Sequence, residues 1–191
     1  MTLILRGNGV VEGLTDLPAG SVTAADLASG AITSSALPAG SVLQVVSVTK
    51  TSRFTTTSTS FTDVTGFSAT ITPSSASSKI LVIASTTGAC NASTGPVFIN
   101  LTRAGSSVYI GDAVNSAVRC SSYLTSASND KAQAMSINYL DSPATTSAVT
   151  YQIQTRSESG SIVSVGGSTN TGVANVSGAT PSTILLLEVA G

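Results

Sequence analysis

The chain has 191 residues, with 8 Lys plus Arg against 9 Asp plus Glu and no histidine, so its formal charge is -1 at pH 7. A charge this close to zero gives no electrostatic attraction to nucleic acid, and we expect no nucleic-acid partner. The absence of histidine excludes imidazole bases, Ser-His-Asp triads and His-ligated metals. No acidic pair has D-x-D spacing, so neither a calcium loop nor a glycosidase carboxylate pair is indicated. We therefore expect no enzyme, and no catalytic residue, cofactor or metal.

Only 9% of the residues are charged, while roughly 60 are Ser or Thr. Hydroxyl groups rather than ions therefore keep the surface wet. The hydrophobic content of 41% is enough for a buried core, and the length suits one domain plus an appendage. The start Met1 to Arg6 has no basic leader, and the longest later apolar run, Ile184 to Leu187, is far below the roughly 20 residues that span a bilayer. We expect synthesis in the cytoplasm and no membrane insertion.

Two cysteines, Cys90 and Cys120, lie thirty positions apart without a C-x-x-C motif. A zinc site would need two more ligands. The pair is compatible with two buried thiols or with one disulfide between two loops.

A ten-residue repeat occupies the N-terminal segment. The hexapeptide Leu17 to Val22 recurs identically at Leu37 to Val42, and the intervening decade keeps Gly, Leu and an aliphatic residue in phase. Two apolar side chains per ten residues are too few for a monomeric core, so the repeat favours an extended arm, residues 1–42, that winds around copies of itself. A flexible linker would have a similar composition. The residues expected at the interface of this arm are Leu17, Val22, Leu27, Ile32, Leu37 and Val42.

From residue 43 to residue 191 the sequence predicts an all-β head domain, an antiparallel β-sandwich of jelly-roll type. Short β-branched and aromatic runs alternate with clusters of Gly, Ser, Asn, Asp and Pro. Period-two alternation is clear around Met135 to Tyr139 and Val149 to Ile153. The predicted strands are Val42 to Thr51, Arg53 to Thr57, Phe61 to Val64, Ser68 to Thr72, Lys79 to Thr86, Val97 to Thr102, Val108 to Ile110, Ala132 to Leu140, Val149 to Arg156, Ile162 to Val165 and Thr183 to Val189.

Two of these strands are apolar on both faces, Ile80 to Ile83 and Ile184 to Leu187. In an antiparallel sandwich this pattern indicates central strands whose outer face is covered. Another subunit would cover it, with Ile184 and Leu186 at the interface, although the N-terminal arm of the same chain could also do so.

Three Ser-, Asn- and Gly-rich segments are expected as long loops, Thr87 to Pro96, Gly111 to Lys131 and Ser157 to Thr180. Such loops suit adaptable hydrogen-bonded recognition, and ordinary solvated loops have the same composition. The densest group of side chains able to hold a polyol or glycan is Arg119, Tyr123, Asp130 and Lys131.

Several segments, in this order, resemble the β domain of small fibre and decoration proteins of tailed bacteriophages, notably those of marine hosts and cyanobacteria. The opening Met1 to Leu5 with Gly7 to Val10 is similar to their N-terminal attachment strand. The other segments that carry the resemblance are Leu37 to Val46, Phe54 to Asp63, Ile71 to Pro73, Ser78 to Val82, Asn100 to Arg103, Tyr139 to Pro143, Val149 to Tyr151 and Ser182 to Glu188.

The resemblance implies a homotrimeric protein on the virion surface, attached through its N-terminus to the major capsid protein or a tail adaptor, and without enzyme activity. It transfers no binding residue. With only about 42 residues before the head domain, the length favours a capsid decoration protein, cement protein or head fibre. The alternative is a tail fibre or tail-tip protein that recognises host surface glycans.

Overall fold

The computed structural model describes residues 4–5, 11–12, 36–92, 95–125, 131–170 and 178–191. These described residues form an all-β structure without an α-helix, and their strand pairs are antiparallel. Strand-rich structure agrees with the many β-branched residues and the frequent turn clusters of the sequence.

The chain divides into two compact units, Met1–Leu37 and Pro38–Gly191. In the first unit β1 (Ile4–Leu5) pairs with β2 (Val11–Glu12). The second unit begins before Val42 because the amide of Gly40 donates to the carbonyl of Ala190, and the amide of Ala190 donates to the carbonyl of Ser41. The predicted arm residues Leu17, Val22, Leu27 and Ile32 lie outside the described residues.

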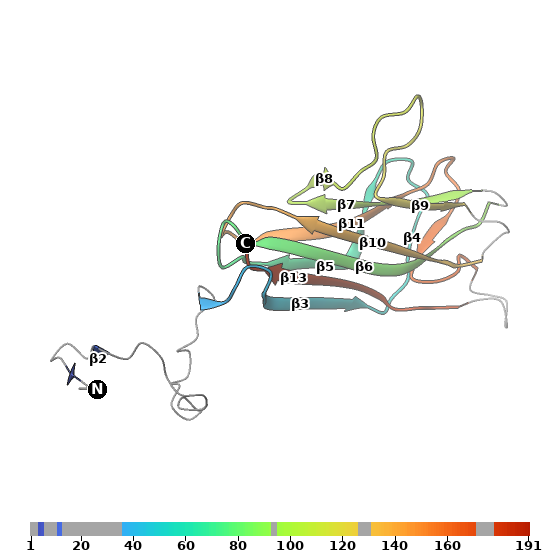
Figure 1. The fold of residues 1–191 in the computed structure, drawn as a ribbon. Coiled ribbons are helices and arrows are strands. Elements are labelled where there is room, and N and C mark those ends of the chain that lie inside the picture. The colour runs from blue at the N-terminus through green and yellow to red at the C-terminus, as the bar shows by residue number, and fades with distance from the viewer. Residues whose placement is uncertain (1–3, 6–10, 13–35, 93–94, 126–130, 171–177) are drawn as a thin grey trace. The chain divides into compact units, whose positions relative to one another are not determined.

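We call the second unit the β domain, and its described residues form eleven strands in two sheets (Figure 1). The first sheet has the order β3-β13-β6-β12-β4, and β10 also pairs with β6. The second has the order β5-β11-β7-β8, and β9 also pairs with β7. The strand bounds are β3 Val42–Lys50, β4 Phe54–Thr56, β5 Thr62–Ile71, β6 Lys79–Cys90, β7 Pro96–Arg103, β8 Ser106–Val108, β9 Ser122–Thr125, β10 Gln133–Asp141, β11 Val149–Arg156, β12 Val163–Val165 and β13 Ser182–Val189.

One apolar core joins the two sheets. Alternate residues of both sheets belong to it, among them Val82 and Leu186 from the first sheet and Leu101 and Ile153 from the second. The period-two alternation read from the sequence is confirmed, since Met135 and Ile137 of β10 are buried while Ser136 and Asn138, which follow them, are exposed.

Four strands differ from the sequence-based prediction by more than one residue at an end. β8 is Ser106–Val108 where Val108 to Ile110 was expected. β5 is one strand of ten residues where two were expected, because Gly66, with φ +77°, allows the chain to bulge rather than turn away. The side-chain amide of Gln152 on β11 donates to the backbone carbonyls of Val64 and Phe67 in this bulge, at 3.0 and 3.3 Å. β6 continues to Cys90, and β9 lies inside the segment predicted to be a loop from Gly111 to Lys131.

Candidate subunit-contact face

The first sheet carries a row of apolar side chains across its outer face. Four strands contribute one residue each, and the register places them side by side: Val45 of β3 opposite Leu187 of β13, Leu187 opposite Leu81 of β6, and Leu81 opposite Leu140 of β10. Since side chains alternate between faces, their neighbours Val46, Leu186, Val82 and Tyr139 point to the core. The row therefore lies on the side away from the core.

The next row along the strands is apolar only in its centre. Leu185 and Ile83 lie opposite one another, flanked by Ser47 and Asn138. The row beyond carries only hydroxyl groups, on Thr49, Thr183, Ser85 and Ser136. At the other end Val42 pairs with Val189, which pairs with Lys79. We call the eight aliphatic residues of these rows the outer apolar patch: Val42, Val45, Leu81, Ile83, Leu140, Leu185, Leu187 and Val189.

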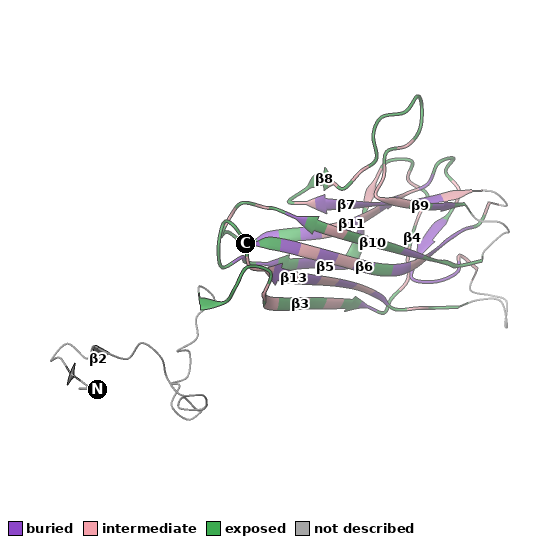
Figure 2. Cartoon of the chain, viewed as in Figure 1, coloured by how far each residue is buried: buried purple, intermediate pink, exposed green. Residues whose placement is uncertain are grey.

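Several side chains of the outer apolar patch are exposed to solvent. Val42, Val45 and Leu140 are 52%, 56% and 49% exposed. The patch members on the central strands β6 and β13 are half-buried, as the alternation of colours along these strands in Figure 2 shows. Uncovered aliphatic side chains on central strands are unfavourable in water, so this surface is suited to contact with another molecule.

The outer face of the second sheet is polar. The hydroxyls of Thr70 and Thr150 are 2.8 Å apart, and the amide of Gln154 donates to Asp63 at 2.8 Å. The amide of Asn100 donates to the hydroxyl of Ser107 at 2.7 Å. These polar side chains satisfy one another, the first two pairs on the surface and Asn100 buried, so the two sheets present chemically different faces.

The size of the first sheet's outer face agrees with that of a subunit contact. With strands about 4.8 Å apart and alternate residues about 6.7 Å apart, four nine-residue strands cover roughly 600 Å² in projection. A standard protein interface buries about 800 Å² of accessible surface per partner, which is a similar extent. The patch would form its apolar centre and the hydroxyl rows its rim.

The structure places the predicted interface residues differently from the expectation. Ile184 and Leu186 have no exposed surface and belong to the core of their own chain. They are therefore not available to a neighbouring subunit, and the outward residues of β13 are Leu185 and Leu187. Val42 lies in the patch, and Leu37, 38% exposed, precedes the β domain.

The predicted ligand loop is not assembled as a cluster in the described residues. Arg119 is exposed and donates through Nε to the carbonyl of Gly111 at 2.7 Å. Tyr123 lies on β9, 64% exposed, with its ring 6.1 Å from that of Phe98. Lys131 precedes β10, and Asp130 lies outside the described residues. In the described residues Arg119 contacts Gly111 and Tyr123 contacts Phe98, neither of which belongs to the predicted group.

The two cysteines are free thiols rather than a disulfide. Cys90 is buried at the end of β6, and Cys120 is partly buried before β9. Burial raises the pKa of the Cys120 thiol, which keeps it protonated at neutral pH.

A buried carboxylate connects the two sheets. Asp141, at the end of β10, is 3% exposed and accepts two bonds of 2.9 Å from Nη1 of Arg103 on β7. It also accepts from the hydroxyl of Tyr151 at 2.6 Å and from that of Tyr139 at 3.3 Å. Burial, followed by the bond to Asp141, raises the pKa of Tyr151. We call these four residues the Asp141 cluster, and sequence reasoning missed it because its members come from three distant segments.

A second buried carboxylate, Glu188, fixes the end of β13. It accepts from the backbone amide and the hydroxyl of Ser74, both at 2.7 Å, and from the side-chain amide of Gln44 at 2.6 Å. Burial alone would raise the pKa of this carboxyl, but the hydrogen bonds from Ser74 and Gln44 outweigh it and lower the pKa from its ordinary value. Both buried carboxylates therefore stabilise the fold through these hydrogen bonds.

Comparison with protein-family models finds no match, and comparison with curated proteins finds none either. Within the described part of the chain, no group of three or more His, Cys, Asp or Glu side chains could hold a metal ion. The described residues contain no helix that is long and apolar enough to cross a bilayer.

Proposed function

We propose that the chain is a homotrimeric structural protein of a tailed-phage virion. Residues 1–42 attach it to the major capsid protein or a tail adaptor, and the β domain projects from the virion surface. A capsid decoration protein, cement protein or head fibre is the form we favour, and no catalytic step is assigned to it.

The outer apolar patch is the observation that carries this proposal. It lies on the first sheet alone, crosses four strands, and has one charged residue, Lys79, at its end. Two copies of a surface whose centre is uncharged can face one another there without like-charge repulsion, so copies of the same chain suit it as partners.

The strand order supports a jelly-roll sandwich as the finer description of the fold. The eight main strands divide into β3-β13-β6-β10 and β5-β11-β7-β9, so strands consecutive along the chain mostly change sheets. Double-sheet jelly rolls of eight strands recur in viral capsid proteins. The likeness concerns architecture, and by itself it does not determine a function.

A tail-fibre or tail-tip protein that binds host glycans is the second candidate. The exposed aromatic rings of Tyr109 and Tyr123, 48% and 64% exposed, favour it, because aromatic rings with a polar tip are common in recognition surfaces. Tyr109 directly follows β8 and Tyr123 lies on β9, and the projecting loop connects these two strands (Figure 1).

Quantitative mass spectrometry of purified particles, together with antibody labelling in electron micrographs, tests this proposal. Hundreds of copies per particle on the head support a decoration protein, and a few copies per tail support the second candidate. Particles that lack the protein would contradict both.

A further inference from the structure

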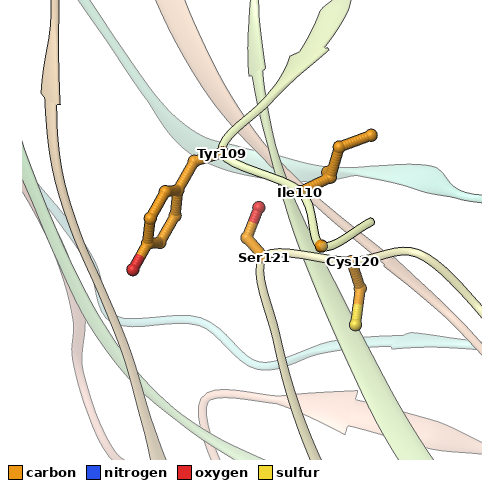
Figure 3. A pocket seen from close by; sticks show the side chains of 5 residues that line it. Tyr109, Ile110, Cys120 and Ser121 are labelled. Carbon is orange, nitrogen blue, oxygen red and sulfur yellow. The ribbon is translucent and has the colours of Figure 1, made fainter. Parts of the chain in front are cut away.

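The two ends of the loop between β8 and β9 form a small pocket. The residues that line it are Tyr109, Ile110, Gly111, Cys120 and Ser121 (Figure 3). Tyr109 has φ +52°, and its ring is stacked on that of Tyr139 with centroids 5.0 Å apart. The hydroxyl of Ser121 accepts from the backbone amide of Leu101 at 2.9 Å, so this polar group is already bonded within the chain.

Two arginines of the β domain keep both Nη groups without an acceptor among the described residues. Arg119 donates through Nε to the carbonyl of Gly111 in this pocket at 2.7 Å, and Arg156 donates through Nε to the carbonyl of Ser157 at 3.0 Å. Arg119 is exposed, whereas Arg156 is partly buried. A guanidinium that is partly withdrawn from water gains more from a carboxylate partner than a fully solvated one does.

Aromatic rings flank Arg156 on the outer face of the second sheet. Phe98 of β7 lies opposite Arg156 of β11, and Phe61 directly precedes Thr62, which lies opposite Thr155. The guanidinium carbon of Arg156 is 5.8 Å from the ring centroid of Phe98 and 6.0 Å from that of Phe61. We call Phe61, Arg156 and Phe98 the Arg156 row.

The rings restrict the position of the guanidinium. Phe98 is 8% exposed, and the ring of Tyr123 on β9 lies 6.1 Å from it on the side away from Arg156. Cation–π contacts use the faces of the aromatic rings and leave the N–H groups of the guanidinium free to donate. These N–H groups lie in one plane and match the two oxygens of a carboxylate.

No acidic side chain of the described residues is paired with Arg156. Asp63 accepts from the side-chain amide of Gln154 at 2.8 Å, and Glu158 lies on the exposed turn after β11. Neither forms an ion pair with Arg156. The Arg156 row therefore combines an unpaired positive charge with apolar ring surface. Arginine and aromatic residues are enriched at the centres of protein interfaces, so this combination suits a protein partner.

We propose that the Arg156 row binds an acidic side chain of a partner protein. The carboxylate pairs with both Nη groups of Arg156, and an aliphatic neighbour of the acidic residue packs on the partly exposed ring of Phe61. The row lies on the second sheet and shares no residue with the outer apolar patch of the first sheet. The inference therefore goes beyond the proposed subunit contact, and either can fail without the other.

A peptide titration of the full chain, followed by saturation-transfer NMR, tests this inference. The probe is the capped peptide acetyl-Leu-Asp-Leu-amide, and acetyl-Leu-Asn-Leu-amide is its neutral match. We expect transfer to the leucine methyl protons of the acidic peptide, with a Kd of about 1 mM, and binding of the neutral peptide that is weaker by about fivefold or more. Equal binding of the two peptides, or no binding of the acidic one, would overturn the proposal.

Three variants assign the binding to the Arg156 row, and thermal unfolding checks that each is folded. Arg156→Lys keeps the charge but loses the planar fork, so it should weaken binding of the acidic peptide by about fivefold or more. Phe61→Leu removes one flanking ring and should weaken it by about threefold. Arg119→Gln is the matched change at an exposed arginine and should bind as the wild type does. Unchanged binding in folded Arg156→Lys, or loss of binding in Arg119→Gln, would contradict the assignment.

Discussion

Leu187 of β13 and Leu81 of β6 lie opposite one another on the outer face of the first sheet, while the residues next to them, Leu186 and Val82, are fully buried in the core. Two central strands are thus apolar on both sides although only one side has a partner within the β domain. The outer pair lies between the more exposed Val45 and Leu140, and it forms the centre of the proposed subunit contact.

Leu187→Asp is expected to block self-association while the β domain stays folded. A carboxylate at the centre of an apolar contact would be buried without a partner in the assembly, but would remain solvated in a free subunit. Sedimentation velocity and far-UV circular dichroism check the two effects. Thr150→Asp, an exposed change on the polar face of the second sheet, is the matched control and should associate normally.

Leu186→Asp should behave oppositely, although it lies one position away. Its side chain has no exposed surface, so a carboxylate there enters the core and costs several kcal/mol of folding free energy. Thermal unfolding should show a lost or strongly lowered transition. If Leu186→Asp folds normally and only fails to associate, the register of β13 described above is wrong.

Asp141→Asn tests the connection between the sheets. The change removes the charge that pairs with Arg103 and weakens the bond from Tyr151, which lies within the core. Breaking a buried pair costs about 3–5 kcal/mol, and the partial exposure of Arg103 suggests the lower end. The melting temperature should fall by roughly 6–12 °C. Asp63→Asn, at an exposed contact with Gln154, should change stability by less than about 0.5 kcal/mol.

The pH dependence of stability should be flat near neutrality and fall on both sides. The pKa of Glu188 is lowered in the folded chain, so its stabilisation is complete above its ordinary value of 4.5 and is lost as the pH falls through the folded pKa. The pKa of Tyr151 is raised, so its contribution is complete below its ordinary value of 10.0 and is lost as the pH rises beyond it. With no histidine in the chain, no step is expected between pH 6 and 8.

Urea unfolding across this range measures the profile. Glu188→Gln should reduce the loss of stability on the acid side, because the group that takes up a proton is gone. Glu158→Gln, on an exposed turn, should leave the profile unchanged. An unchanged acid limb in Glu188→Gln would show that other carboxyls dominate it.

Truncation tests the boundary between the two units. A chain that begins at Pro38 should unfold cooperatively, because it keeps the bonds that Gly40 and Ser41 make with Ala190. A chain that begins at Leu43 loses these bonds and should be less stable by about 1–3 kcal/mol. Equal stability of the two truncated chains would show that the segment before Val42 adds nothing to the β domain.

The sequence predicts the strand-rich fold well because period two is a local signal. β11 is predicted with its observed bounds, Val149 to Arg156, since apolar and polar residues alternate from Val149 to Gln154. The sequence predicts two strands in place of β5, Phe61 to Val64 and Ser68 to Thr72, whereas the side-chain amide of Gln152 from another strand stabilises a bulge between them. Such support across the sheet is not visible in local composition.

The inward face of β13 was assigned incorrectly for a related reason. Ile184 to Leu187 is apolar at every position, so the sequence does not show which of these residues point to the core. The acidic Glu188 suggests that the face of β13 on which it lies, together with Ile184 and Leu186, is exposed to solvent. In the folded chain Glu188 is fully buried and bonded to Ser74 and Gln44. Contacts between residues more than a hundred positions apart determine the phase of β13. Bonds of the Asp141 cluster likewise join residues from different strands, up to 38 positions apart.

The stacked pair of Tyr109 and Tyr139 was missed because its two members come from separate strands. The small polar residues of the sequence predict a binding loop beside this pair, but the residues proposed for it are Arg119, Tyr123, Asp130 and Lys131. A positive φ at tyrosine carries no signal in the sequence, since the residue type argues against it.

Sedimentation equilibrium of the full chain at micromolar concentration tests the central claim most directly. The account predicts one species of three times the chain mass of 18.9 kDa, and Leu187→Asp should shift it to the mass of a single chain. A folded wild-type protein that sediments at 18.9 kDa over the same concentrations would contradict the proposed subunit contact and the trimer with it.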